Sequence, residues 1–538
     1  MKKIIIIVAL LISTLCISSI ALAGQSWYVD NLVASSGNGQ SWSTAWKTFS
    51  NINYGSVSCG DTIYISGGHS GTTQTYTTLL AIDKTCTNKD SPLTITVGTD
   101  PDHNGTVKIT GVPIGISISE KNYIKIDGQS GEDEKRHIEI AGTTSYGIYV
   151  SGASSYNIFK YLYLHDIGSD DNDYYTALRI RTTGMENLIG YDISYCSFEG
   201  TMDAISISAV DDVKASSFGG VKIHHNYIKA HDDGILSDGT TEIYDNIISR
   251  DTDVGKGHPD GIQVYGSYVK IYNNLFTGFL DQNSGNSVVY WEPDGSENIN
   301  INNHQPCCFQ VYNNVFYETG SQIAPLTAVM LGVSDSRFTS LNDLQILNNT
   351  FNGNFAIALT LAFGNTSLDK SVVTNVNILN NIFYNAAKSG ASMLTLNRPS
   401  YTTTPVDYGS YNSGANIIVD YNAYYSDSTT SVGYLGTTYT YSNFLSVSSC
   451  QENGVTKSIN LNSDLTLQYD SPCKNAIPTA NAPRIFTTDK LGITRPQGSA
   501  WDIGAYEFRS NTPMIGVYNV KGMSGYYNAN GMVGIAPN

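Results

Sequence analysis

Short runs of alternating apolar and polar residues recur along the middle of the chain, and most lead into a pair of asparagines. The clearest copy reads VKIYNNLF at residues 269–276. Alternation rich in β-branched and aromatic residues is typical of a strand, and asparagine tolerates the left-handed backbone of a turn. Each copy therefore predicts one strand and one turn. Further copies lie at residues 221–228, 242–248, 310–316, 344–351 and 376–383.

The second asparagine of each copy recurs after gaps of 20 to 41 residues, which is the signature of a solenoid with loops of variable length. Stacked coils would place these asparagines in one longitudinal row at a turn, where their amides can hydrogen-bond from coil to coil. The aromatic residue or isoleucine two positions later would stack inside the core. The predicted row contains Asn226, Asn246, Asn274, Asn314, Asn349 and Asn381, and a degenerate copy adds Asn422.

The pattern resembles the right-handed parallel β-helix over residues 105–425, so we expect an all-β solenoid with a cap at each end. Segments WYVD (27–30), GQSWSTAW (39–46) and GDTI (60–63) resemble the opening of a large group of secreted bacterial β-helix proteins with a pectate-lyase-like fold. Segments DKLGITRP (489–496) and DIGAYEF (502–508) resemble the closing part of the same group. This resemblance implies a secreted or surface-associated protein of carbohydrate-rich settings.

Five segments follow from this reading. Residues 1–23 contain two lysines, an apolar stretch and the sequence ALA, which together predict a secretory signal peptide. A membrane anchor is the alternative, but the apolar stretch is short and interrupted by serine and threonine. Residues 24–104 form the N-terminal cap and first coils, 105–425 the β-helix, and 426–508 the last coils and C-terminal cap. We expect residues 509–538 to be a loosely ordered tail.

Only 14% of the residues are charged, while glycine (50) and tyrosine (37) are abundant, as in β-rich extracellular proteins with many turns. Cleavage of the signal peptide would remove two lysines, leaving 28 basic and 47 acidic residues and a formal charge of −19. An acidic surface repels nucleic acid and anionic membranes. We therefore expect a monomer that binds a polysaccharide or a cell-surface glycan, with no membrane span after cleavage.

Seven cysteines remain after the predicted cleavage, and none has the spacing of a zinc site. In an oxidising compartment they can form disulfides. Because they lie close together within each cap, we predict that Cys59 pairs with Cys86 and that Cys450 pairs with Cys473.

Three coils share a second register, in which an aspartate precedes a small residue and an isoleucine. The aspartates are Asp203, Asp233 and Asp260, separated by 30 and 27 residues, and His231 and His258 each precede one of them by two positions. If they start strands of neighbouring coils, they stack at about 4.8 Å per coil. We expect these five residues to form one solvent-open cluster that carries catalysis, provided that the aspartates lie in the turn before each strand.

Stacked carboxylates at that spacing repel one another. Either a bound cation neutralises them, or the pKa of one carboxyl group rises above that of its neighbour, so that one serves as an acid and the other as a base. The first outcome predicts a calcium ion held by Asp232, Asp233 and Asp260, with no other cofactor. The segments are similar to the DDG and TDG strand starts that carry catalytic or calcium-binding aspartates in pectate lyases and polygalacturonases, although the GHG segment of polygalacturonases is absent. The structural alternative is that each aspartate caps a turn before glycine.

Candidate sugar-binding residues follow the last of these aspartates. Gln263 lies on the next predicted strand, and the long excursion at residues 280–308 carries Tyr290, Trp291 and Glu292. Long loops on rigid scaffolds collect binding residues, and aromatic side chains are the usual platforms for sugar rings. Trp291 has the alternative of packing against the coil.

Two function classes remain open from the sequence. The first is a carbohydrate-active enzyme, either a polysaccharide lyase that uses a cation or a glycoside hydrolase that uses two carboxyl groups. The second is a non-catalytic adhesin or envelope protein that binds glycan along a flat face. An enzyme requires its ionisable residues to converge, and the β-helix fold supports both classes.

Overall fold

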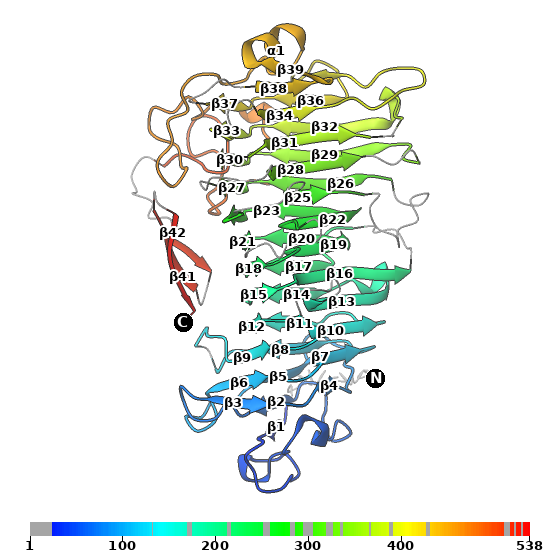
Figure 1. Ribbon diagram of the computed structural model, residues 1–538, viewed down its shortest axis with the longest axis vertical. Coiled ribbons are helices and arrows are strands. Elements are labelled where there is room, and N and C mark those ends of the chain that lie inside the picture. Colours follow the sequence, from blue (N-terminus) through cyan, green and yellow to red (C-terminus); the bar gives the residue numbers. More distant parts are fainter. Residues whose placement is uncertain are drawn as a thin grey trace, which may run out of the picture.

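The computed structural model describes residues 24–131, 133–168, 175–211, 217–250, 259–279, 286–293, 305–318, 326–333, 337–353, 355–364, 367–386, 391–426, 431–509, 517–520, 523–528 and 531–537. Within these ranges the chain winds through three long sheets that run side by side along one axis (Figure 1). Sheets A, B and C contain 14, 12 and 13 strands. Each complete coil passes through A, then B, then C, as a right-handed parallel β-helix does.

Sheet A consists of β1 (Ser26–Val29), β2 (Thr62–Ile65), β5 (Leu93–Val97), β8 (Ile124–Asp127), β11 (Ile158–Lys160), β14 (Tyr191–Ser194), β17 (Val221–His224), β20 (Thr241–Tyr244), β23 (Val269–Tyr272), β26 (Cys307–Tyr312), β29 (Leu341–Leu347), β32 (Val373–Leu379), β35 (Tyr408–Gly409) and β36 (Ile417–Asp420). Sheet B consists of β3 (Thr73–Tyr76), β6 (Thr106–Ile109), β9 (Ile138–Ala141), β12 (Leu162–His165), β15 (Ser197–Thr201), β18 (Tyr227–Ala230), β21 (Ile247–Arg250), β24 (Leu275–Thr277), β27 (Val315–Glu318), β30 (Thr350–Gly353), β33 (Ile382–Tyr384) and β37 (Ala423–Tyr425). Neighbouring strands within each of these two sheets are parallel.

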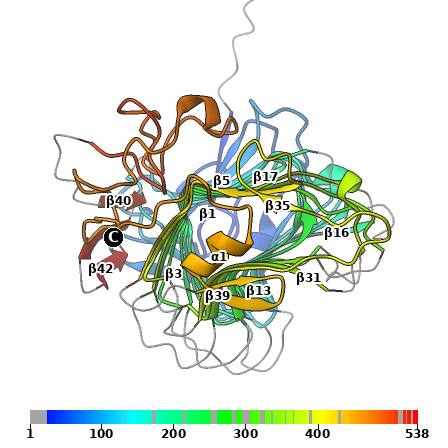
Figure 2. The same cartoon turned by 90° about the horizontal axis from the view of Figure 1, so that it is seen from above.

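Sheet C consists of β4 (Leu80–Ile82), β7 (Ile114–Ser119), β10 (Tyr146–Gly152), β13 (Thr176–Gly184), β16 (Asp203–Asp211), β19 (Ile235–Gly239), β22 (Ile262–Ser267), β25 (Asn286–Trp291), β28 (Leu326–Val333), β31 (Ile357–Phe363), β34 (Ser392–Leu396), β38 (Ser431–Tyr434) and β39 (Thr437–Thr440). Its last strand, β39, is antiparallel to β38 and leads into helix α1 (Tyr441–Val447), which lies over the end of the coil (Figure 2). Single-turn 3₁₀ helices occur at Trp42–Thr44, Phe49–Asn51, Met185–Asn187, Lys370–Val372 and Thr479–Asn481.

The two asparagines of each repeat have different roles. The first adopts the left-handed backbone at the turn between sheets A and B, as at Asn273 (φ 57°). The second is buried, and its amide continues the row: Asn274 Nδ2 donates to Asn314 Oδ1 (3.1 Å) and to the carbonyl of Ile243 (2.9 Å). This confirms the predicted row, which runs without a break through Asn226, Asn246, Asn274, Asn314, Asn349, Asn381 and Asn422.

Each repeat also contains a second strand, which the sequence reading did not separate from the turn. In the copy at residues 269–276, β23 ends before the asparagines and β24 begins directly after them. The aromatic residue on this second strand points into the core, so Phe276 stacks on Phe316 with 4.7 Å between ring centroids, and Phe316 stacks on Phe351 at 4.6 Å. Polar and aromatic rows therefore run along the axis beside each other.

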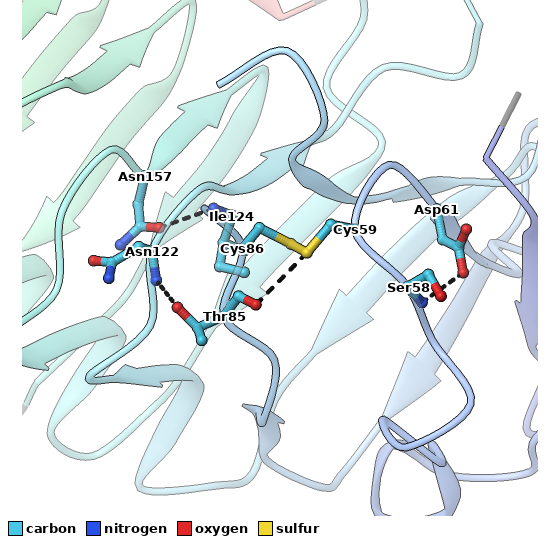
Figure 3. Close-up of a disulfide and its surroundings, with 8 residues drawn as sticks. All are labelled: Ser58, Cys59, Asp61, Thr85, Cys86, Asn122, Ile124 and Asn157. Carbon is cyan, nitrogen blue, oxygen red and sulfur yellow. Dashed lines mark hydrogen bonds between the residues drawn. A yellow bond between two sulfur atoms is a disulfide. The ribbon is translucent and has the colours of Figure 1, made fainter. Parts of the chain in front are cut away.

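The three opening segments of the sequence meet in the N-terminal cap. The Trp27 ring stacks on Trp46 with 5.2 Å between centroids, and the Trp27 indole donates to Asp61 (2.8 Å). The predicted disulfide between Cys59 and Cys86 is present beside these contacts (Figure 3). It joins the turn before β2 to the segment after β4, and thus ties the cap to the first coils.

The closing segment at residues 486–508 folds back along the turn between sheets A and B. There it binds the first asparagines of the repeats: Asn313 donates to the carbonyl of Thr488 (2.8 Å) and Asn348 to that of Asp502 (3.1 Å). A fully buried ion pair, Arg495 with Glu507 at 2.9 Å, lies at its centre. The left-handed asparagines therefore serve as a docking row for the end of the chain.

The predicted pairing of Cys450 with Cys473 is wrong. Both are buried but unbridged, and they pack in separate apolar clusters, Cys450 with the main core and Cys473 with Ile477 and Ile503. Burial raises the pKa of each thiol to about 12, so both remain protonated. Each behaves as a small apolar side chain.

The tail was expected to be loosely ordered, but it contains an antiparallel sheet of β40 (Val517–Val520), β41 (Met523–Asn528) and β42 (Gly531–Pro537). The predicted signal peptide, residues 1–23, lies outside the described residues. No helix in the ranges given above is long and apolar enough to cross a membrane.

Candidate functional site

The predicted aspartates stack in register at the turn between sheets B and C. Pairing of Ile205 with Ile235, and of Ile235 with Ile262, aligns Asp203, Asp233 and Asp260 in successive coils. Their side chains are not open to solvent, however, since they are 4%, 7% and 1% exposed. Asp203 lies on β16 two residues before an inward-facing isoleucine and therefore points to the same side of the strand, whereas Asp233 and Asp260 precede β19 and β22 and are held inward by backbone amides of the next coil.

The backbone of each following coil donates to this aspartate ladder, which we define as Asp203, Asp233 and Asp260. The amide of Asp260 donates to Asp233 Oδ1 (2.8 Å), and the amide of Ser287 donates to Asp260 Oδ1 (2.6 Å). At the other end, the Thr176 hydroxyl donates to Asp203 Oδ2 (3.3 Å). The aspartate ladder thus repeats the arrangement of the asparagine row at a second turn.

Burial makes the ladder carboxyls weak acids. It raises the pKa of Asp203 to about 8, with a further contribution from the charge of Asp232. The pKa values of Asp233 and Asp260 are raised well above their usual range, again by burial first. Protonated carboxyls are neutral and can stack without repulsion, so at neutral pH these aspartates resemble asparagines. Asp260 Oδ2 is buried and has no hydrogen-bond partner among the described residues.

Of the remaining members of the predicted cluster, Asp232 lies beside the ladder and its charge acts on all three ladder carboxyls. Asp232 is 8% exposed, and the His231 side chain lies on the sheet B side, 3.9 Å from where a Cβ of Gly200 would be. His258 lies outside the described residues. In the described part of the chain, no group of three or more His, Cys, Asp or Glu side chains is arranged to hold a metal ion. The calcium site therefore stays a prediction from the sequence.

The predicted sugar-binding residues divide between the two faces of sheet C. Trp291 points inward, is fully buried and stacks on Phe309 with 4.9 Å between centroids, so it is a core residue and cannot contact a glycan. Tyr290 and Glu292 point outward and are half-buried. Gln263, on β22 of the preceding coil, donates through Nε2 to Glu292 Oε2 (3.2 Å). These three outward side chains form one continuous polar patch, in which Tyr290 and Glu292 are half-buried and Gln263 is only 6% exposed.

The sequence reading missed the row that completes this surface. Pairing of Ser237 with Val264, and of Val264 with Trp291, brings the next residues, Asp238, Tyr265 and Glu292, onto the outside of sheet C in successive coils, although a β-bulge shifts the register of β19 and β22 directly after Ser237. We call Asp238, Gln263, Tyr265, Tyr290 and Glu292 the outer-face site. The sequence contained a signal for this row. Asp238 and Tyr265 each lie five residues after a ladder aspartate, and an odd spacing along a strand places a residue on the face opposite to that aspartate.

Burial weakens the acidity of one carboxyl group of the outer-face site, that of Asp238. Burial raises the pKa of Asp238 to about 6, although the Ala209 amide donates to it (3.2 Å) and the positive charges of Arg179 and Arg181 act in the opposite direction. Burial, followed by the charges of nearby carboxylates, raises the pKa of Tyr265. The Tyr265 hydroxyl therefore remains a donor between two acids.

Arg179 and Arg181 lie on β13, on the same outward side of sheet C as Asp238. Arg179 pairs with Ser206 in the register of β13 and β16, and it lies three coils before Gln263. Arg179 is half-buried and Arg181 is exposed. The outer face of sheet C therefore changes along the axis from basic to acidic, which can orient a bound chain.

Comparisons with known proteins give structural likeness without sequence likeness. No protein family matches the chain, and no curated protein matches its sequence. A solved GH136 lacto-N-biosidase from Eubacterium ramulus is similar over 76% of this chain and 68% of that chain, with 10% identity and a TM-score of 0.40.

Two further solved structures are a pectate lyase and a surface adhesin of Streptococcus pneumoniae. The pectate lyase is similar over 90% of this chain and 97% of that chain, with 13% identity and a TM-score of 0.34. The adhesin is similar over 73% and 85%, with 12% identity and a TM-score of 0.25. At these values the likeness concerns the fold alone, which the three parallel sheets already define.

Proposed function

We propose that the protein binds a polysaccharide along the outer face of sheet C and hydrolyses it there, with Asp238 as general acid and Glu292 as general base. The observation that carries this proposal is the single outward row in which these two carboxyl groups flank Tyr265. Their backbones are two strand spacings apart, about 9.6 Å. Inverting glycosidases separate their carboxyl groups by about 6.5–9.5 Å, so the two side chains need to lean slightly towards each other to leave room for one water molecule.

Asp238 has the protonation behaviour that a general acid needs, because its raised pKa, about 6, supplies a proton near neutral pH. Glu292 accepts a hydrogen bond from Gln263 (3.2 Å), which orients its carboxyl group. An acid and a base with different environments are thus present on one accessible surface.

In the proposed reaction, Asp238 donates its proton to the glycosidic oxygen as the bond between that oxygen and the anomeric carbon breaks. Glu292 removes a proton from a water molecule, whose oxygen forms the new bond to the anomeric carbon from the opposite side. The proton count balances, since one carboxyl loses a proton and the other gains one. Gln263, Tyr265 and Tyr290 supply polar contacts to the sugar hydroxyls, and Tyr290 also offers an aromatic surface.

The composition supports an extracellular role for this activity. The signal-like sequence at residues 1–23 and the acidic net charge are the grounds on which we propose secretion, with a polysaccharide or a cell-surface glycan as substrate. The aspartate ladder is assigned to the scaffold, because its members face inward and bind backbone amides.

The test is cleavage of a panel of polysaccharides by the full chain, followed as release of reducing ends. Asp238→Asn and Glu292→Gln should each lower the rate by about 10²–10⁴-fold, the range for loss of a general acid or base, while binding in affinity electrophoresis persists. The matched control is Asp203→Asn, a change of the same kind inside the ladder, which should keep full activity. Equal activity of Asp238→Asn and the wild type would overturn the assignment.

The other function classes give distinct results in the same assay. New unsaturated chain ends, detected by ultraviolet absorbance, would identify a lyase. Binding that is lost in Tyr290→Ala, without any cleavage by the wild type, would identify the non-catalytic adhesin.

A further inference from the structure

Two adjacent cysteines, Cys307 and Cys308, lie at the start of β26, where the chain turns from sheet C into sheet A. Their sulfur atoms are 2.6 Å apart. A disulfide bond is about 2.05 Å long, so only about 0.5 Å separates this contact from a covalent bond. The two thiols are therefore held close to the geometry of the oxidised pair.

The surrounding turn imposes this geometry on the pair. Cys308 has a left-handed backbone (φ 59°), which is uncommon for a residue other than glycine. Tyr268, at the equivalent turn of the preceding coil, is also left-handed (φ 62°) and lies beside Cys308, because Val269 pairs with Phe309. Burial first, and then the neighbouring sulfurs, raise the pKa of Tyr268 to about 12, so its hydroxyl remains available to donate to sulfur.

The other cysteines of the described chain have different environments. Cys59 and Cys86 already form a disulfide, whereas Cys196, Cys450 and Cys473 are each buried without a bonded sulfur neighbour. Cys307, in contrast, is half-exposed and can be reached by a small reagent. Cys307 therefore combines access from solvent with a second sulfur atom beside it.

We propose that Cys307 and Cys308 are a modification site that closes to a vicinal disulfide. The Cys307 thiolate attacks an external disulfide such as oxidised glutathione, which forms a mixed disulfide and releases one thiol. Cys308 then attacks the Cys307 sulfur, forms the new bond and releases the second thiol. Overall, two protons and two electrons pass from the protein to the external disulfide, and the ring that forms holds the turn before β26.

The test is to equilibrate the folded full chain with oxidised glutathione, denature it without reductant, alkylate it and digest it. Mass spectrometry of the peptide containing residues 307–308 should show no alkylation and a mass two hydrogens below the dithiol. After reduction the same peptide should take two alkyl groups. Cys59–Cys86 reports that the sample was oxidised, and Cys196, Cys450 and Cys473 report that alkylation was complete.

Single substitutions give the matched controls. Cys308→Ser removes the resolving thiol, so Cys307 should remain as a mixed disulfide with glutathione instead of losing it. Alkylation of both cysteines in the wild type, or two bound glutathiones, or a link to a different cysteine, would each overturn the proposal when Cys59–Cys86 is found oxidised. The digestion readout does not depend on glycan cleavage, so it stands apart from the proposed hydrolytic function.

Discussion

Replacement of Asp203 by asparagine should stabilise the protein at neutral pH, which is the opposite of the usual effect of changing a buried polar residue. Asp203 is 4% exposed, accepts a hydrogen bond from Thr176 and has its pKa raised to about 8 by burial. An asparagine oxygen can accept the same hydrogen bond, and the amide has no ionisation to suppress. The substitution therefore removes an electrostatic penalty and leaves the scaffold contact in place.

The magnitude follows from proton linkage. An aspartate in an unfolded chain has a pKa of about 3.9, so the folded state binds the Asp203 proton more tightly. The stability that this difference supplies is complete below about pH 3.9 and is lost as the pH rises towards 8, at about 1.4 kcal/mol per pH unit. For an isolated group the loss at pH 7 is about 4 kcal/mol. Asp232 and Asp233 share the penalty, so we expect Asp203→Asn to gain about 2–4 kcal/mol at pH 7.

Denaturant unfolding followed by tryptophan fluorescence at pH 4, 6 and 8 measures this difference. The variant and the wild type should be similar at pH 4 and should diverge as the pH rises. Asp369→Asn is the contrasting control, because backbone and hydroxyl donors of Thr403 and Thr402 hold the pKa of the exposed Asp369 below its usual range. That variant should lose stability above about pH 4. A destabilised Asp203→Asn at pH 8 would refute the ladder as a row of protonated acids.

Substitutions at three places in the scaffold are compared by the denaturant concentration at the midpoint of unfolding. Asn274→Ala interrupts the buried amide row and should cost about 2–4 kcal/mol, whereas Asn273→Gly, at the left-handed position, should cost much less. Phe316→Ala opens a cavity in the stacked aromatic row and should cost about 3–5 kcal/mol. Arg495→Met leaves the charge of the buried Glu507 without its counter-ion and should cost about 3–5 kcal/mol.

The repeat was predictable because its information is local. Each copy of VKIYNNLF carries its own strand, turn and core aromatic, so aligned copies locate the Asn274 row without knowledge of the loops. The same alignment placed the aspartates in register. It did not give their burial, because Asp233 and Asp260 lie before the start of β19 and β22 and are nevertheless held inward by backbone amides of the next coil.

The outer-face site was harder to predict because it has no motif of its own. Asp238, Tyr265 and Glu292 are of three residue types, and only their shared offset from the ladder connects them. Cysteine pairing failed for a related reason. Proximity in sequence was correct for Cys59 and Cys86, but within the C-terminal cap the chain folds back along the coils and separates Cys450 from Cys473.

The closing segment can dock only after the coils that it contacts have been synthesised. Its contacts reach four coils made much earlier, through Asn273, Asn313, Asn348 and Asn380, which bind Lys490, Thr488, Asp502 and Gly504. A ribosome makes each of these asparagines more than a hundred residues before it makes the residue that binds it. The nascent solenoid can therefore lengthen while this flank is still open. Only a chain translated through the closing segment can cover it, so a chain that stops before residue 486 lacks all four contacts.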